Sequence, residues 1–187
     1  MKKLGLILFA LFFWHAYGYA QWIAVKTNLL YDATATFNLG FEAALQKHVS
    51  VDLSGNFNPW TFPNDKSLKH WMVQPEVRYW LHEAFNGHYL GLHAHYADYD
   101  VVGIRLPAGM EPDYCYDGYS YGVGLAYGYQ LYLSPRWNVE FTVGGGYTYL
   151  EYDKYDFPKE EGWSLGKFRN KYWGLTKVGI SIVYLIN

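Results

Sequence analysis

His93 and His95 are the residues of this sequence whose spacing could bind a metal ion. Two positions apart on a strand, they point to the same face with Cα atoms roughly 7 Å apart, which permits shared ligation. A zinc site needs three or four ligands, and the sequence offers no further Cys or His pair with ligand spacing. They are therefore weak metal candidates, and we expect neither a metal nor another cofactor.

Eight charged residues form the largest candidate polar site, and a fold could bring them to one interior face. They are Lys26, Asp32, Glu42, Asp52, Glu76, Arg78, Glu140 and Lys177. Charges inside a protein must be paired with opposite charges, because an unpaired charge in a low-dielectric interior is costly. We expect a polar core that fixes the fold; an ion path is the alternative use of such a set.

The elements that must position these residues are strands. From 119 to 133 the odd positions are apolar or aromatic and the even positions small or polar, and residues 137–149 repeat the alternation. Successive side chains of a strand point to opposite faces, so these two segments predict an antiparallel hairpin. Six noisier segments alternate likewise: 23–33, 37–46, 49–58, 72–82, 88–99 and 171–185. Pro75 predicts a bulge, since proline cannot donate a ladder hydrogen bond.

The connections between the eight segments alternate in length. Short ones fall near 46–48, 83–87 and 134–136, and long ones near 59–70, 102–116 and 154–169, with 34–36 as a short exception. Short periplasmic turns and longer outer loops are typical of outer-membrane barrels, whose even strand number leaves both termini in the periplasm. The long connections hold many acidic residues and Cys115, the sole cysteine, so we expect no intramolecular disulfide.

The composition favours a closed barrel in a membrane over a secreted sandwich or lipocalin-like barrel. Aromatic residues make up 21% of the chain, with 20 Tyr and 8 Trp, and such rings gather at membrane–water interfaces. The polar face of the strands is rich in small residues, which suit a narrow closed interior. We therefore predict an eight-stranded antiparallel up-and-down transmembrane β-barrel. Its aromatic girdle would include Tyr119, Tyr121, Trp137, Tyr147 and Tyr149.

The first residues resemble an export signal. Lys2 and Lys3 precede an apolar run over 4–14, and Gly18-Tyr19-Ala20 is a small-x-small cleavage site. The run is short for a membrane-spanning helix. We predict a signal peptide over 1–20 and a mature outer-membrane barrel over 21–187. The formal net charge of −2 gives no basic surface for nucleic acid.

The C-terminal strand carries a pattern that resembles the signal read by the β-barrel assembly machinery. Lys177, Gly179, Ile182 and Tyr184 occupy its polar, glycine, apolar and aromatic positions. The chain continues past Tyr184 to Asn187 instead of ending on an aromatic residue, so the match is imperfect.

Longer runs carry a family resemblance over essentially the whole mature chain. These are the segments 25–32, 38–42, 51–60 and 74–80, together with the glycine-rich hairpin. They are similar to a family of Bacteroidetes outer-membrane proteins known only as a domain of unknown function. The resemblance implies a small OmpA-like, OmpX-like or OmpW-like barrel, often encoded near surface or fimbrial genes, with no established activity.

We expect a structural or surface-interaction role, as a scaffold or accessory protein associated with fimbriae or another surface partner. The other expected partners are outer-membrane lipid, lipopolysaccharide and the assembly machinery. A small lipid-modifying enzyme, of the lipid-A acyltransferase or deacylase type, is the alternative, but Ser67 and His70 lack any recognisable catalytic signature. We therefore expect no catalytic site. A narrow channel is the third hypothesis.

Overall fold

Nine strands and one short helix make up the computed structural model, which describes residues 23–63, 66–156 and 163–186. In chain order they are β1 (Ile23–Asn28), α2 (Leu29–Asp32), β2 (Phe37–Gln46), β3 (Val49–Asn58), β4 (Thr61–Phe62), β5 (Lys66–Trp80), β6 (Gly87–Val102), β7 (Tyr114–Ser134), β8 (Trp137–Asp156) and β9 (Ser164–Ile186). No helix in these ranges is long and apolar enough to cross a membrane. The predicted signal peptide lies outside the described residues.

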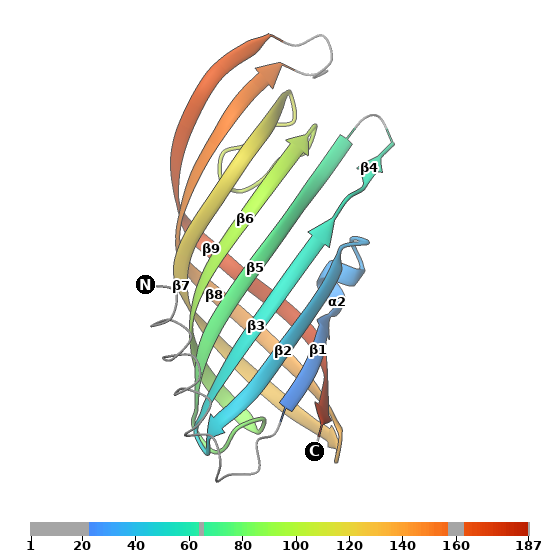
Figure 1. Ribbon diagram of the computed structural model, residues 1–187, viewed down its shortest axis with the longest axis vertical. Coiled ribbons are helices and arrows are strands. Elements are labelled where there is room, and N and C mark those ends of the chain that lie inside the picture. The colour runs from blue at the N-terminus through green and yellow to red at the C-terminus, as the bar shows by residue number, and fades with distance from the viewer. Residues whose placement is uncertain (1–22, 64–65, 157–162, 187) are drawn as a thin grey trace, which may run out of the picture.

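Eight of the strands close into a ring (Figure 1). Each pairs antiparallel with its neighbours in the order β1, β2, β3, β5, β6, β7, β8 and β9, and β9 returns to β1. The two-residue β4 pairs with β5 alone. The predicted all-β, up-and-down antiparallel fold is thus confirmed as a ring of eight strands.

Several strand limits differ from the prediction. β1 ends at Asn28 because its side chain accepts a hydrogen bond from the Leu30 N–H and caps α2. The predicted bulge at Pro75 is wrong: the pairs Val73–Tyr96 and Glu76–His93 keep one register on both sides of it. Bulges instead interrupt β2–β3, β7–β8 and, twice, β8–β9.

The strands on one side of the ring are much longer than expected. β6 to β9 extend past β1, β2 and β3 at the end where the long connections lie, called here the long-loop end (Figure 1). Residues 114–116, 154–156 and 164–169, assigned to long connections from the sequence, are strand, as are residues 66–70 of β5. Residues 117–118 and 150–153 lengthen the two strands of the predicted hairpin. Both faces of these extensions carry polar and aromatic residues, so the alternation that marks a strand is weak there.

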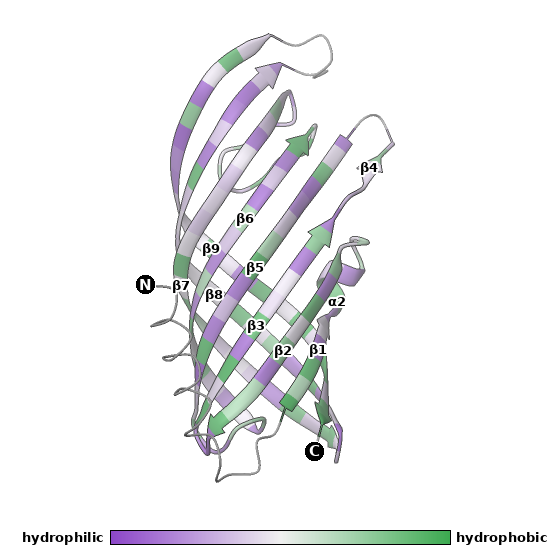
Figure 2. Ribbon diagram, in the orientation of Figure 1, coloured by the Kyte–Doolittle hydropathy of each residue, from purple (hydrophilic) through white to green (hydrophobic). Residues whose placement is uncertain are grey.

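Apolar and polar residues alternate along the strands (Figure 2). Two small apolar cores occupy the interior of the ring at its two ends. Near the short turns the core contains Ala24, Trp80, Phe85, Tyr89, Val183 and Leu185. At the long-loop end it contains Tyr99, Val101, Met110, Tyr116 and Leu150, and residues of the 103–113 connection pack against it. Between the two cores the interior is polar.

Candidate functional site

Arg78 lies in the interior of the ring and is completely buried. Its Nη1 donates to Glu42 Oε2 and to Glu140 Oε2, both at 2.7 Å, and its Nη2 donates to Glu140 Oε1 at 3.2 Å. Its Nε donates to Glu76 Oε1 at 2.9 Å. The Tyr89 ring covers the guanidinium, with the Arg78 Cζ 4.3 Å from the ring centroid. Carboxylates from β2, β5 and β8 therefore meet at one guanidinium through charge-assisted hydrogen bonds.

Two lysines extend this arrangement. Lys26 Nζ lies 2.9 Å from Glu42 Oε2 and 2.6 Å from Asp52 Oδ2. Lys177 forms an ion pair with Glu76. The structure thus brings seven of the eight predicted charges together in one ionic network, defined as Lys26, Glu42, Asp52, Glu76, Arg78, Glu140 and Lys177.

The register of the sheet explains why the cations are needed. Glu42, Asp52 and Glu76 are successive Cα partners across β2, β3 and β5. Like charges directly opposite one another destabilise a sheet, so the buried lysine and arginine between these carboxylates offset their repulsion. A glycine provides the space: a Cβ at Gly91 would overlap Glu76 Oε1.

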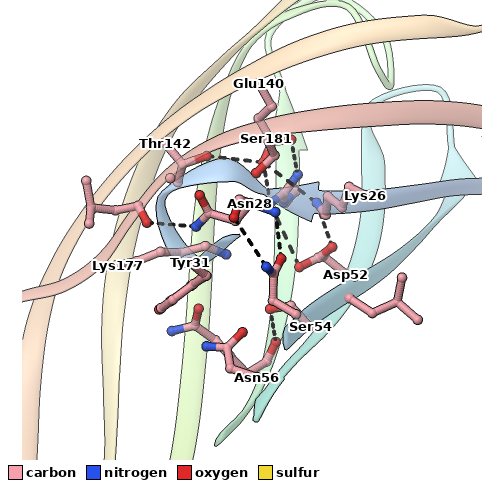
Figure 3. A pocket seen from close by; sticks show the side chains of 17 residues that line it. Lys26, Asn28, Tyr31, Asp52, Ser54, Asn56, Glu140, Thr142, Lys177 and Ser181 are labelled. Carbon is pink, nitrogen blue, oxygen red and sulfur yellow. Dashed lines mark hydrogen bonds and ion pairs between the residues drawn. The ribbon is translucent and has the colours of Figure 1, made fainter. Parts of the chain in front are cut away.

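A cavity of about 40 Å³ adjoins the ionic network (Figure 3). Most of the residues that line it have polar side chains, among them Lys26, Asn28, Asp52, Gln74 and Lys177, and their carbon atoms contribute much of its surface. The space suffices for roughly three water molecules. The apolar core near the short turns fills the interior on the far side of the ionic network.

His93 and His95 also point into the interior, with ring centroids 6.3 Å apart. His93 Nε2 lies 2.9 Å from Thr176 Oγ1, and His95 Nε2 lies 3.1 Å from Thr148 Oγ1. A Cβ at Gly124 would lie 2.8 Å from His93 Cε1, so the histidine packs where only glycine fits. Over the described ranges no group of three or more His, Cys, Asp or Glu residues could hold a metal ion.

Asp32 is the predicted network residue that the structure places elsewhere. It is exposed at the end of α2, where it accepts hydrogen bonds from Thr27 Oγ1 at 2.9 Å and Asn38 Nδ2 at 2.7 Å. The prediction that it faces the interior is wrong because the Asn28 cap ends the strand alternation four residues earlier.

Ser67 and His70 do not meet. They stand three residues apart on β5, and successive side chains of a strand alternate between faces. Ser67 Oγ donates to the Asp100 carbonyl at 3.4 Å, and His70 Nδ1 lies 2.9 Å from the Leu68 carbonyl. Each is therefore engaged by a main-chain oxygen.

The outer face of the ring is apolar and exposed over its middle; Leu125, for example, is 69% exposed. Aromatic pairs border this apolar surface at two levels. Near the short turns Trp137 packs against Tyr184 with ring centroids 4.8 Å apart. Towards the long-loop end the pairs are Tyr121–Tyr149 at 5.2 Å, Tyr147–Trp173 at 5.0 Å and Tyr96–Tyr119 at 6.3 Å. The five proposed girdle residues all lie at one of these two levels.

The residues of the suggested assembly signal lie on β9 where the ring closes. Lys177 and Gly179 face the interior. Ile182 and Tyr184 face outward, and Tyr184 is the Cα partner of Val25 on β1.

Three further cations lie on β9: Lys171 is the Cα partner of Tyr149 at the aromatic level, and Arg169 and Lys167 follow towards the long-loop end. Glu151 Oε2 lies 3.0 Å from Arg169 Nε, and Glu151 Oε1 lies 3.7 Å from Lys167 Nζ. Desolvation acts to raise the pKa of Glu151, but attraction to the Arg169 guanidinium and to Lys167 lowers it below its ordinary value. We call Lys167, Arg169 and Lys171 the basic edge. Their spacing of two within one strand is the signal that could have revealed them.

These features define a class of protein: a closed antiparallel ring of eight strands with charges inside and exposed apolar residues outside. Over residues 6–186 the chain matches the family model described as a protein of unknown function, DUF3575, and it belongs to that family. No curated protein and no solved structure matches the chain.

Proposed function

We propose that this protein is a transmembrane β-barrel of the bacterial outer membrane that serves as a scaffold or accessory for surface interactions. The observation that carries the proposal is the inverted distribution of polarity. Fully buried side chains include Arg78, Glu42 and Glu76, whereas leucine, valine and phenylalanine side chains are exposed around the outside. An exposed apolar surface of this extent is stable against lipid, because water would strongly disfavour it.

The spacing of the two aromatic levels fits a bilayer. On β8 Tyr147 lies ten positions after Trp137. At about 3.3 Å per residue and a tilt of about 40°, they differ in height by about 25 Å. The outward apolar band of outer-membrane barrels is about 25 Å tall between its aromatic girdles.

The orientation follows from the two ends of the ring. β1 begins and β9 ends beside the short turns, which we place in the periplasm. The extended ends of β6 to β9 then project from the membrane on the outside of the cell. The suggested export signal, the assembly pattern on β9 and the resemblance to Bacteroidetes OmpA-like proteins support the same location. Outer-membrane lipid, lipopolysaccharide and the assembly machinery are the partners that this location implies.

The packed interior favours a scaffold over a channel. Arg78 and Trp80 are completely buried, and the ionic network spans the ring at that level. An ion path would need a continuous polar opening, whereas the chamber beside the network measures about 40 Å³. The proposal assigns a role to the outer surface and the long-loop end, and no catalytic residue.

The test is the behaviour of the purified protein in detergent. A closed barrel should migrate differently in gel electrophoresis with and without boiling and should give a β-rich circular dichroism spectrum. Intact mass should place the mature N-terminus at Gln21. Identical mobility of the boiled and unboiled protein, together with a helical spectrum, would contradict the barrel. A retained Met1 would contradict the export signal.

A further inference from the structure

β9 is much longer than the strand that closes the ring against it. β1 pairs with β9 only from Ser181 to Ile186. Asn28 extends the contact through its side chain, which accepts from the Ile180 N–H at 3.2 Å and donates to the Val178 carbonyl at 3.1 Å. From 164 to 177, β9 pairs with β8 alone, and no other strand of the described residues lies along its second side. This segment is an open sheet edge.

Main-chain N–H groups point outward from this edge. The Leu175 N–H donates to Tyr172 Oη at 3.1 Å, and the Lys171 N–H donates to Asn170 Oδ1 at 2.7 Å. Both therefore point away from β8. Alternate residues of a strand direct their N–H to the same side, so the Trp173 N–H between them also points to the open edge. A strand laid along this edge would find donors at regular spacing.

The edge is held in place before any partner binds. The 103–113 connection folds behind the extended strands, and Met110 from it is buried against Tyr116 and Leu150. Asn170 of β9 donates to the Ala108 carbonyl of the same connection at 2.8 Å. A preformed edge lowers the entropy cost of binding an extended segment.

The charge of β9 indicates which segment would fit. Between 164 and 175, β9 contains three cations, Lys167, Arg169 and Lys171, and no acidic residue. One carboxylate, Glu151 of β8, pairs with Lys167 and Arg169. A second copy pairing edge to edge would bring these cations together, and like charges on adjacent strands repel. Trp173 is 77% exposed beside them and offers an apolar contact. An acidic strand with interspersed apolar residues complements this pattern.

We propose that the β9 edge, from 164 to 175, binds an extended acidic segment of a partner protein as an added strand. Main-chain hydrogen bonds to the edge would supply affinity, and the basic edge would select acidic side chains. The partner carbonyls replace Asn170 Oδ1 and Tyr172 Oη at the Lys171 and Leu175 N–H groups. This inference rests on the surface-interaction role proposed above and names the kind of partner.

The test uses the full protein in lipid nanodiscs and a synthetic peptide of twelve residues in which Asp and Glu alternate with Val and Thr. The matched control peptide has Lys in place of every acid. We expect the acidic peptide to bind, the basic peptide not to bind, and amide exchange over 167–175 to slow only with the acidic one. Exchange that stays unchanged while the acidic peptide binds would overturn strand addition.

Two variants at one position separate main-chain pairing from charge. Lys171→Ala and Lys171→Pro both remove the charge, but only proline removes the N–H, and β8 does not use that N–H. Lys171→Pro should weaken peptide binding about tenfold more than Lys171→Ala does. Proline removes one main-chain hydrogen bond to the peptide and misaligns the hydrogen bonds on either side of it. If the two variants bind the acidic peptide with equal affinity, the Lys171 N–H does not pair with it and charge attraction alone accounts for binding. That result would overturn the proposal.

Further outcomes are also decisive. Heat-dependent mobility of each variant shows that the barrel is intact. If the barrel is intact and binds neither peptide, the edge proposal is overturned and the membrane scaffold is not affected. If the unsubstituted protein shows no heat-dependent mobility, the scaffold proposal itself is overturned. Concentration-dependent dimerisation that Arg169→Glu strengthens would assign the edge to a second copy instead.

Discussion

The guanidinium of Arg78 and the carboxylate of Glu140 are joined by two hydrogen bonds, of 2.7 and 3.2 Å, across 62 positions of sequence. The pair connects β5 with β8, which are not neighbours in the ring, so it crosses the interior instead of following the sheet. Both side chains are buried, and salt screens their attraction less than it would at a surface. This contact ties opposite walls of the ring together.

Glu140→Leu should therefore be strongly destabilising. The substitution removes the carboxylate that accepts two hydrogen bonds from the buried Arg78 guanidinium, and removing one partner of such a buried pair typically costs about 3–5 kcal/mol. Urea unfolding in a lipid bilayer measures the loss. Glu151→Leu is the matched control, since Glu151 is also on β8 and also pairs with an arginine, but on the outer surface. An unfolding midpoint for Glu140→Leu as high as that of the control would contradict a buried network.

Glycines that face the interior should resist substitution more than those outside. A Cβ at Gly128 would overlap the Tyr89 ring, which packs against Trp80 with centroids 4.8 Å apart. A Cβ at Gly55 would meet only the Met72 carbonyl at 3.6 Å. Gly128→Ala should cost about 1–3 kcal/mol through overpacking, and Gly55→Ala should be close to neutral. Equal effects of the two, measured by the same unfolding experiment, would show that Tyr89 can move aside freely.

Period-two alternation accounts for most of what the sequence could predict. It depends on one face meeting apolar surroundings and the other meeting a polar interior, which holds for β2, β3 and the hairpin of β7 and β8. It also marked the interior charges without showing their partners. That Arg78 would reach Glu140 depends on ring closure and strand tilt, and neither is encoded by any local pattern.

The failures of prediction have local causes. Asn28 fits the alternation as a strand residue, yet its side chain caps a helical turn, so Asp32 leaves the interior. The extended ends of β8 and β9 lack a consistently apolar face, so alternation could not reveal them. The bulge opposite Gly144 and Gly145, where Thr176 is inserted, shifts the facing of β9 by one residue. An odd–even count continued from the outward residues 178–184 would therefore place the basic edge on the interior face.

Asn28→Ala should loosen the junction between β1 and β9. The side chain accepts hydrogen bonds from the Leu30 and Ile180 N–H groups and donates to the Val178 carbonyl. Loss of a helix cap and its neighbouring bonds should cost about 1–2 kcal/mol. Amide exchange at Ile180 should rise sharply, while exchange at Val183, deep in the β1–β9 pairing, should change little. Protection at Ile180 equal to that of the unsubstituted protein would argue against this junction.

The facing of β8 gives the most direct test of the membrane proposal, because adjacent residues should respond in opposite ways. Val143 is 51% exposed on the outer face near the middle of the apolar band, whereas Thr142 is buried inside, where its hydroxyl donates to Glu140 Oε1 at 3.2 Å. Val143→Lys should cost about 2–4 kcal/mol in a bilayer if it reaches the midplane. Thr142→Ser keeps the hydroxyl and should be nearly silent. In a soluble protein an exposed valine would accept lysine without loss, since surface substitutions seldom change stability by more than about 0.5 kcal/mol. If Val143→Lys leaves the free energy of unfolding in a bilayer unchanged, the outer face of this ring does not contact lipid at Val143.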